Sequence, residues 1–304
     1  MSWETVLDAQ IAARLPALRW LAEEPLARHT SFRIGGPARR MAFPKSAEEV
    51  EGLAALLRAA GIRPVVIGNG TNVLAPDAGV DAVVIAMGDG MDTLRRAEGP
   101  ELVAAAGVSL ARLATFAWRE GLTGLEFAHG IPGSLGGAVV MNAGAYGGTM
   151  ADVLTEVTAL FPDGVRTLRA EELALGYRHS LFTEQPEAIV LGARLRLRPG
   201  DPAAIRARMD ELMARRRASQ PLEWPSAGST FKRPEGHFAG ALIEQCGLKG
   251  ARVGGAEVSV KHAGFVINTG GATCADVLAL MAQIEKTVFD ATGVTLEPEV
   301  RILG

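Results

Sequence analysis

The amino-acid sequence predicts an α/β (α+β) protein made of two or three subdomains around a shared cleft. Three features support this class: a strand–helix–strand pattern near the N-terminus, a glycine-rich but apolar run in the middle, and strands with a period of two after it. A chain of 304 residues also exceeds one ordinary domain. We expect residues 1–88 and 89–200 to form two subdomains and residues 201–304 a third, whose last strand returns to the active site.

Composition and charge exclude several classes of protein. The formal net charge is −3, which argues against binding to nucleic acid or to an anionic membrane surface. Charged residues interrupt the N-terminus, so it lacks the apolar core of a signal peptide. The longest apolar runs, such as residues 82–87, are too short to cross a bilayer. We therefore expect a cytoplasmic protein without membrane insertion.

The cysteines and histidines predict neither a disulfide framework nor a metal site. The two cysteines, Cys246 and Cys274, have no CxxC spacing. The five histidines show no HExxH motif and no paired spacing. Neither a disulfide nor a bound metal is therefore expected.

The first elements are a helix, a strand and a second helix. Residues 2–28 are predicted to be helical, although their periodicity is weak. A short strand follows at residues 40–43. Ser46 and Glu49 then form a capping box, which starts a helix that ends at Gly61.

A glycine loop follows the next strand. Residues 64–67 form a buried strand that ends in the sequence GNGTN at residues 68–72, and two more strands follow at residues 82–86 and 102–106. Ligands gather at the carboxyl ends of strands in open α/β sheets. Val73 stands where a GxGxxG fingerprint has its third glycine, and no GK[ST] motif is present. Taken alone, the loop is explained equally well as an ordinary turn.

The central run from Gly121 to Gly148 is unusually rich in glycine. Ser109 is predicted to cap the helix that ends where this run begins, and nine of the 28 residues in the run are glycine. The residues between them are apolar, which indicates a tightly packed backbone. Residues 132–137 lead into a possible helix, whose N-terminus offers N–H groups suited to phosphate. The alternative is a helix packed on a sheet, with glycines for steric reasons alone. Together with residues 68–72, this run predicts two loops that grip one diphosphate cofactor.

After the central run the hydrophobic period changes to two. Residues 153–161 and 165–168 predict a hairpin, and residues 191–198 predict a strand with one face of arginines. Asp201 is placed as the N-cap of a helix that has Pro202 in its first position.

The last third of the sequence predicts two helices and a strand. The first helix carries Ile205, Met209, Leu212 and Met213 on one face. The second extends over residues 277–288 and ends at Gly293, and residues 294–303 form the closing strand.

Three polar clusters contain the candidate catalytic residues. Arg178 lies in YRHS, Ser229 in SAGSTFKRP and Glu299 in EPEVR. Each has a plainer alternative, which is a surface salt bridge for Arg178, a turn hydroxyl for Ser229 and a solvated strand face for Glu299. No GxSxG motif is present, so a hydrolase nucleophile is not expected.

The chain resembles the UDP-N-acetylenolpyruvoylglucosamine reductases. The matching stretches, in family order over almost the whole chain, are TSFRIGGPA (30–38), GNGTNVL (68–74), GLEFAHGIPGSLGGAVVMNAGAYG (124–147), YRHSLF (177–182), SAGSTFKRP (226–234), GGAEVS (254–259) and LEPEVRIL (296–303). The resemblance implies two FAD-binding subdomains of the vanillyl-alcohol-oxidase type, at residues 1–88 and 89–200, and a substrate-binding domain after them. The short stretch between Gly147 and Tyr177 resembles the shorter, second class of this family.

The resemblance also implies a role for each matching residue. Arg178 is expected to meet the substrate carboxylate, Ser229 to donate a proton and Glu299 to act as a second acid. Arg233 stands where some relatives carry Asn. The expected substrate contacts are Tyr177, Lys232 and Arg233. The expected cofactor contacts are Gly68, Asn69, Gly70, Thr71, Asn72, Gly121, Ile131, Pro132, Gly133, Ser134, Gly136, Gly137, Asn142 and Gly144.

The reaction implied by the resemblance is the reduction of UDP-N-acetylglucosamine enolpyruvate to UDP-N-acetylmuramate for peptidoglycan synthesis. NADPH reduces non-covalently bound FAD, whose N5 delivers a hydride to C3 of the enolpyruvyl ether, and Ser229 protonates C2. An oriented cation such as Arg178 suits the negative charge that accumulates on C2 and the carboxylate. Two alternatives stay open: another oxidoreductase on the same fold, such as an alcohol oxidase, and a non-catalytic nucleotide-binding protein. The three candidate catalytic residues argue against both.

Overall fold

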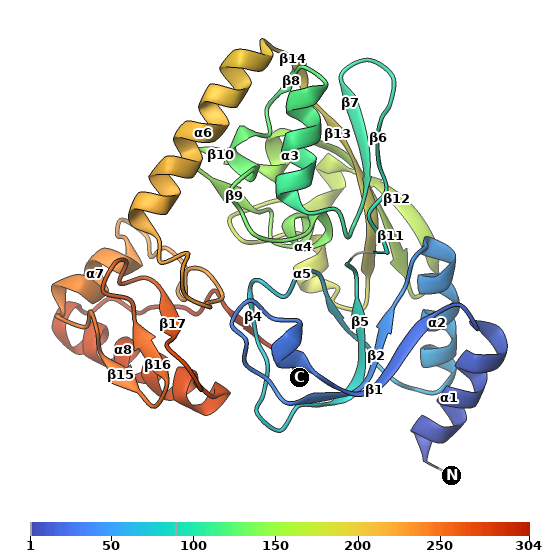
Figure 1. The fold of residues 1–304 in the computed structure, drawn as a ribbon, viewed down its shortest axis with the longest axis horizontal. Coiled ribbons are helices and arrows are strands. Elements are labelled where there is room, and N and C mark those ends of the chain that lie inside the picture. The colour runs from blue at the N-terminus through green and yellow to red at the C-terminus, as the bar shows by residue number, and fades with distance from the viewer. Residues whose placement is uncertain (1, 89) are drawn as a thin grey trace. The chain divides into compact units, whose positions relative to one another are not determined.

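The computed structural model describes residues 2–88 and 90–304 and divides the chain into two compact units (Figure 1). Unit 1 comprises the chain up to Leu21 together with Arg40–Asn69 and Ala82–Arg215. Unit 2 comprises Ala22–Arg39, Gly70–Asp81 and Arg216–Gly304. Unit 2 thus combines two short N-terminal segments with the C-terminal part of the chain. The three segments expected at residues 1–88, 89–200 and 201–304 stay a prediction.

Helices and strands alternate along much of the chain. The α-helices of the described residues are α1 (Trp3–Arg14), α2 (Ala47–Ala59), α3 (Leu110–Arg119), α4 (Leu135–Val140), α5 (Leu181–Glu184), α6 (Pro202–Ser219), α7 (Ala239–Gln245) and α8 (Cys274–Thr292). The strands are β1 (Arg19–Pro25), β2 (Pro37–Phe43), β3 (Val65–Ile67), β4 (Val73–Leu74), β5 (Val80–Ala86), β6 (Leu94–Arg96), β7 (Glu101–Ala105), β8 (Leu122–Thr123), β9 (Gly144–Ala145), β10 (Gly148–Thr149), β11 (Leu154–Phe161), β12 (Gly164–Arg169), β13 (Ile189–Arg196), β14 (Arg198–Pro199), β15 (Arg252–Val253), β16 (Ala256–Val258), β17 (Val266–Asn268) and β18 (Arg301–Ile302).

Unit 1 is built on two sheets. One has the strand order β1-β2-β5-β3, with β3 parallel to β5, and the other has the order β12-β11-β13-β7-β6 with antiparallel neighbours. The predicted capping box starts α2, where the Ser46 hydroxyl accepts a hydrogen bond from Glu49 N–H over 3.3 Å. Val50, Leu53 and Leu57 are fully buried, as the helical period predicts.

The predicted helix over residues 2–28 is wrong beyond Arg14. Pro16 lacks the N–H that a continuing helix needs, and residues 19–25 form strand β1 instead. The Trp20 indole donates a hydrogen bond to Asp8 of α1 over 2.7 Å, which ties the strand to the helix before it. Arg40 also donates two hydrogen bonds to Asp8, and this pairing, with the Trp20 contact, holds the pKa of the carboxyl below its ordinary value.

The remaining predicted elements of unit 1 are confirmed. Ser109 caps α3, the hairpin of β11 and β12 turns at residues 162–163, and Asp201 accepts from Ala203 N–H at the start of α6. The predicted arginine face of β13 pairs across to β7. Arg196 and Arg194 both donate to Glu101 and thereby lower the pKa of its carboxyl.

Unit 2 has its own hydrophobic core around α8. Thr273 and Asp276 form a capping box at the start of α8, and Gly293 ends the helix with a φ of 72°, so the predicted helix is confirmed. Asp77 adds a second cap, because its carboxylate accepts from Cys274 N–H over 2.7 Å and from Ala275 N–H over 3.0 Å. This contact fastens the Gly70–Asp81 segment to the C-terminal part of the chain.

The predicted closing strand at residues 294–303 is shorter than expected. Only Arg301–Ile302 forms a strand, β18, which runs parallel to β4. Pro298 lacks a backbone donor and pairs with Phe231 only through an isolated bridge. Within the described part of the chain, no helix is both long and apolar enough to cross a membrane.

Candidate active site

The central glycine run of unit 1 forms the entrance to helix α4. The N–H of Leu110 donates to Gly133 O over 3.0 Å, and Leu135 N–H donates to Val108 O over 2.8 Å. Gly133 has a φ of 143°, a conformation open almost only to glycine. Gly136 packs on the sheet side, because a Cβ there would lie 3.0 Å from the Ala106 Cβ. Packing therefore explains part of the glycine excess.

Two other residues of this run, Gly137 and Ser134, have surroundings that leave room or a polar group for a ligand. Gly137 lies exposed on α4, and a Cβ there would meet only the Ser134 hydroxyl, at 3.7 Å. The Ser134 hydroxyl is itself buried and has no hydrogen-bond partner among the described residues. A Cβ on Gly68 would fall 2.1 Å from the same oxygen. A buried hydroxyl without a partner is costly, so a group that accepts or donates there is expected.

This arrangement fits the diphosphate of FAD. Gly68 is the first residue of the sequence GNGTN, and Ser134 directly precedes α4. Because these two residues lie next to each other, the two predicted glycine loops meet inside unit 1. Helix N-termini and glycine loops bind phosphate through backbone N–H groups. The unpartnered Ser134 hydroxyl supplies one further polar contact at the same place.

The glycine loop, defined here as Gly68–Asn72, continues from Gly70 in unit 2. Gly70 has a φ of 60°, and a Cβ there would fall 2.0 Å from His29 O. Glycine at this position is therefore required by packing within the chain itself, in addition to any approach by a ligand. Asn72 follows and makes two contacts with the C-terminal segment: its Nδ2 donates to Glu299 O over 3.2 Å, and its carbonyl accepts from Arg301 N–H over 3.0 Å.

The other predicted cofactor contacts differ in their surroundings. Asn142 has a φ of 40°, and its side chain binds main chain, donating to Gly176 O and accepting from Ala151 N–H, each over 2.9 Å. Gly144 lies in β9, and Ile131 N–H closes a turn onto Ala128 O.

Gly121 is separated from the other predicted cofactor contacts. It ends α3 with a φ of 66°, whereas the opposite end of that ten-residue helix, at Ser109, bridges Ser134. Ten helical residues span about 15 Å. Gly121 therefore lies about one helix length from the Ser134 end of α3, and its contact with the cofactor stays a prediction.

Arg178 lies in a strained turn beside the end of α4. Its φ is 53°, which is unusual for a long side chain, and Gly176 and His179 close the turn around it. The Ser180 hydroxyl anchors the turn by donating to Val140 O over 2.6 Å. Strained backbone persists where the surroundings enforce it, and it clusters at functional sites. The half-buried guanidinium lies 5.2 Å from the ring centre of Tyr177.

Ser229 and Glu299 lie on neighbouring segments of unit 2. Glu299 N–H donates to Thr230 O over 2.8 Å, and Phe231 bridges Pro298 in an antiparallel pair. Ser229 therefore directly precedes Thr230, whose carbonyl accepts from Glu299 N–H. Because Asn72 donates to Glu299 O, the structure brings Glu299 next to the end of the glycine loop.

The contacts of the serine loop, defined here as Ser226–Thr230, distinguish between the two interpretations of Ser229, a proton donor and a turn hydroxyl. The turn hydroxyl of this loop is that of Ser226, which accepts from Gly228 N–H over 3.4 Å. Ser229 is exposed, and within residues 2–88 and 90–304 its hydroxyl has no hydrogen-bond partner. The geometry favours a hydroxyl available to a ligand over one that stabilises the turn.

Two of the predicted substrate contacts, Lys232 and Arg233, follow the serine loop. Lys232 pairs with Glu297 over 3.1 Å at the surface, and the Arg233 guanidinium stacks 3.8 Å above the ring of Phe238. Phe238 is 60% exposed and was missed from the sequence. The sequence feature that could have indicated Phe238 is its position as an aromatic residue directly after the turn Pro234–His237.

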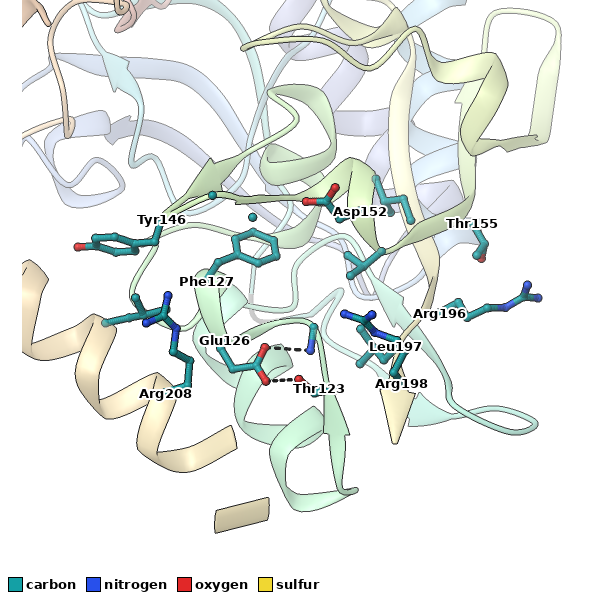
Figure 2. Close-up of a pocket in the computed structure, with 16 residues that line it drawn as sticks. Thr123, Glu126, Phe127, Tyr146, Asp152, Thr155, Arg196, Leu197, Arg198 and Arg208 are labelled. Atoms are coloured by element: carbon teal, nitrogen blue, oxygen red, sulfur yellow. Dashed lines mark hydrogen bonds between the residues drawn. The ribbon is translucent and has the colours of Figure 1, made fainter. Parts of the chain in front are cut away.

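Figure 2 shows a cavity of unit 1 with a volume of about 760 Å³, lined in part by Phe127 and Tyr146. Glu126 at this cavity accepts hydrogen bonds from the Thr123 hydroxyl over 2.6 Å and from Gly124 N–H over 2.9 Å. The cavity shares no residue with the predicted site and takes no part in the function proposed below. In the described part of the chain, no cluster of three or more histidine, cysteine and acidic side chains is arranged to hold a metal ion.

Comparison with known proteins identifies both parts of the chain. Residues 38–169 match the family described as FAD binding domain, and residues 220–303 match UDP-N-acetylenolpyruvoylglucosamine reductase, C-terminal domain. The UDP-N-acetylenolpyruvoylglucosamine reductase of Agathobacter rectalis is 48% identical over 97% of this chain and 97% of its own. That of Syntrophomonas wolfei is 49% identical over 95% of this chain and 97% of its own.

Solved structures agree with these matches. The UDP-N-acetylenolpyruvylglucosamine reductase of Thermus caldophilus superimposes with a TM-score of 0.81 at 36% identity, over 94% of this chain and 99% of that one. An alkyldihydroxyacetonephosphate synthase shares the fold alone, with a TM-score of 0.50 at 18% identity over 64% of this chain and 41% of its own. The predicted vanillyl-alcohol-oxidase type of FAD-binding fold with a C-terminal α+β domain is confirmed. The chain belongs to the UDP-N-acetylenolpyruvoylglucosamine reductase family and is an FAD-binding oxidoreductase.

Proposed function

We propose that this protein reduces the enolpyruvyl ether of UDP-N-acetylglucosamine enolpyruvate to UDP-N-acetylmuramate with NADPH as the reductant. Membership of the reductase family supports the reaction class. The observation that carries the assignment is the placement of the Ser229 hydroxyl, exposed and without a partner in the described chain, beside Glu299 and the end of the glycine loop.

The glycine loop and residues 133–137 would hold FAD. Backbone N–H groups suit a diphosphate, and neither stretch contains a lysine or arginine. The N–H groups of Leu135 and Gly136 already donate to Val108 O and Ala106 O, so the contacts would come from the other residues of these stretches. The buried Ser134 hydroxyl would gain the partner that it lacks within the described chain. When bound, FAD supplies the hydride that reaches the enolpyruvyl carbon.

The chain's own residues would manage the charge and the proton. Arg178 would bind the substrate carboxylate, where negative charge accumulates after hydride addition. Ser229 would then protonate C2, because a hydroxyl is an adequate acid toward so basic a carbon. Glu299 would orient a water, or donate a proton if it is itself protonated. Tyr177, Lys232 and Arg233 would contact the UDP portion.

One experiment separates this function from the alternatives. The purified holoenzyme is reduced with NADPH under nitrogen and then mixed with either UDP-N-acetylglucosamine enolpyruvate or simple alcohols and their carbonyl products. We expect bleaching of the yellow colour by NADPH and rapid reoxidation by the enolpyruvyl sugar nucleotide alone. Reoxidation by a small carbonyl compound instead would indicate another oxidoreductase, and protein that NADPH fails to bleach would contradict the role of NADPH.

Gly137→Val tests the FAD contacts without disturbing the fold. A Cβ at Gly137 meets no protein atom closer than 3.7 Å, so the apoprotein should fold normally. The added side chain blocks close approach of a ligand to the first turn of α4, and FAD affinity should fall at least ~10-fold, equivalent to ~1.4 kcal/mol. Fluorescence titration of apoprotein with FAD measures this change.

Gly88→Val is the matched control for this prediction. A Cβ at Gly88 would also meet no atom within 4 Å among the described residues beyond its chain neighbours, and Gly88 lies outside both predicted loops. This variant should bind FAD as tightly as the wild type does. Wild-type affinity in Gly137→Val would remove the first turn of α4 from the cofactor site.

A further inference from the structure

Ser31 connects the glycine loop to the serine loop within unit 2. Its backbone N–H donates to Gly70 O over 2.9 Å, and its hydroxyl oxygen lies 2.6 Å from Ser226 O and 3.3 Å from Gly70 O. A serine hydroxyl has one proton, so the shorter contact is the bond that the side chain makes. Ser31 thus holds one loop with its main chain and the other with its side chain.

The segment that carries Ser31 is fixed by the core. The neighbouring side chains of Phe32 and Ile34 are each 2% exposed. The Thr30 hydroxyl donates to Ile34 O over 3.1 Å, and the Asn268 amide donates to Phe32 O over 3.0 Å. These contacts do not involve the Ser31 hydroxyl. The segment should therefore keep its position when that hydroxyl is removed.

The serine loop is held at its start, where Ser226 bridges Ile267 and Ala227 is 4% exposed, and it has less support toward Ser229. Its two ends are held where Asn268 N–H donates to Pro225 O and where Thr230 N–H donates to Gly264 O, each over 2.9 Å. Between them, Gly228 has a φ of 78°, a Cβ on it would meet no atom within 4 Å, and Ser229 is exposed. The bond from Ser31 to Ser226 therefore restrains the loop three residues before the proposed proton donor.

We infer that Ser31 is a positioning residue for the reduction of the substrate. Its hydroxyl keeps the serine loop in a fixed place relative to Gly70, and Ser229 thereby keeps a fixed place relative to the part of the glycine loop that lies in unit 2. This inference rests on the proposed function of Ser229 as proton donor. It requires nothing of Ser31 in the reduction of FAD, because the Ser31 N–H bond to Gly70 is independent of its side chain.

The test uses holoenzyme in which Ser31 is replaced by alanine. FAD affinity and the rate of flavin reduction by NADPH should stay at wild-type values. Reoxidation by the enolpyruvyl sugar nucleotide should slow by about 10- to 100-fold, the scale that a misplacement of about 1 Å produces. Ser31→Thr keeps the hydroxyl and should restore the rate. Hydrogen exchange, which needs no turnover, should be faster for the amides of the serine loop in Ser31→Ala.

Thr269→Val is the matched control. It removes another hydroxyl-to-carbonyl bond of unit 2, from Thr269 Oγ1 to Gly255 O over 3.0 Å, outside both loops. A similar loss of thermal stability is expected, with normal reoxidation and normal exchange in the serine loop. Equal slowing in both variants would show a general structural effect and overturn the inference.

Three other outcomes would also overturn it: a Ser31→Ala enzyme reoxidised at the wild-type rate, one that loses FAD, or a Ser31→Thr enzyme as slow as the alanine variant. Failure of the proposed function gives a different result. In that case the wild-type enzyme itself would not be reoxidised by the enolpyruvyl sugar nucleotide, and the exchange measurement would still report whether Ser31 restrains the loop.

Discussion

Replacing Ser229 with alanine is expected to leave the reduction of bound FAD by NADPH near its wild-type rate and to lower net turnover by about 10²–10⁴-fold, the range typical of a positioned general acid. The first step needs no proton at carbon, whereas the second leaves a basic C2 that only a placed acid quenches quickly. Anaerobic stopped-flow absorbance separates the two steps. Ser229→Cys should retain some activity, since a thiol is a stronger acid of similar reach.

The serine loop provides its own control for this experiment. Ser226→Ala removes the hydroxyl that accepts from Gly228 N–H, and it should cost about 1 kcal/mol of stability while slowing turnover per folded molecule far less than Ser229→Ala does. Ser229 has no such bond in the described chain, so Ser229→Ala should unfold at nearly the wild-type temperature. Normal turnover in a folded, FAD-loaded Ser229→Ala enzyme would end the proton-donor assignment.

Local sequence signals predicted the helices of this protein well, because caps and periodicity are encoded within a few residues. Ser46 and Ser109 were predicted as caps, and each precedes a helix and accepts a hydrogen bond from its first turn. The strand β1 was missed because its leucine, alanine and glutamate residues favour a helix when taken alone, and pairing with β2 overrides that preference. The last strand was overextended because Pro298 interrupts its hydrogen bonds.

The glycines show how far composition alone determines a site. Phosphate binding and close packing both predict glycine, and the structure assigns different residues to each explanation. Gly136 packs against Ala106, and Gly121 ends a helix. Gly137 is left exposed with space above it, which only the coordinates reveal. The sequence shows where the glycines are, but the reason for each glycine depends on neighbours that are distant in the sequence.

The contacts that assemble the predicted site were beyond reach of the sequence. The bond from Ser31 to Ser226 joins residues 195 positions apart, and that from Asn72 to Glu299 joins residues 227 positions apart. Both end on main-chain carbonyls, which every residue has, so neither leaves a pattern of residue types. Family resemblance predicted which side chains matter, and the structure adds how those of unit 2 are held together.

Replacing Arg178 with alanine is expected to weaken the substrate half-reaction by about 2–4 kcal/mol, the scale of one lost donor to a developing anion. This corresponds to roughly 30- to 900-fold in rate. The arginine lies in a turn with a φ of 53°, and its guanidinium lies 5.2 Å from the ring centre of Tyr177. Arg178→Lys should recover only part of the loss, because a point charge does not reproduce the two-pronged contact of guanidinium with carboxylate. Single-turnover reoxidation of the reduced enzyme measures both variants.

Arg166→Ala is the matched control for Arg178, since it also removes an arginine of unit 1 that lies over an aromatic ring, that of Phe161 at 3.7 Å. It lies on β12, outside the predicted site, and should leave reoxidation unchanged. Full activity in Arg178→Lys would reduce the role of Arg178 to charge placement. Full activity in Arg178→Ala would support the alternative in which Arg178 forms only a surface salt bridge. A guanidinium that stabilises the anion cannot be removed without slowing the step in which the anion forms.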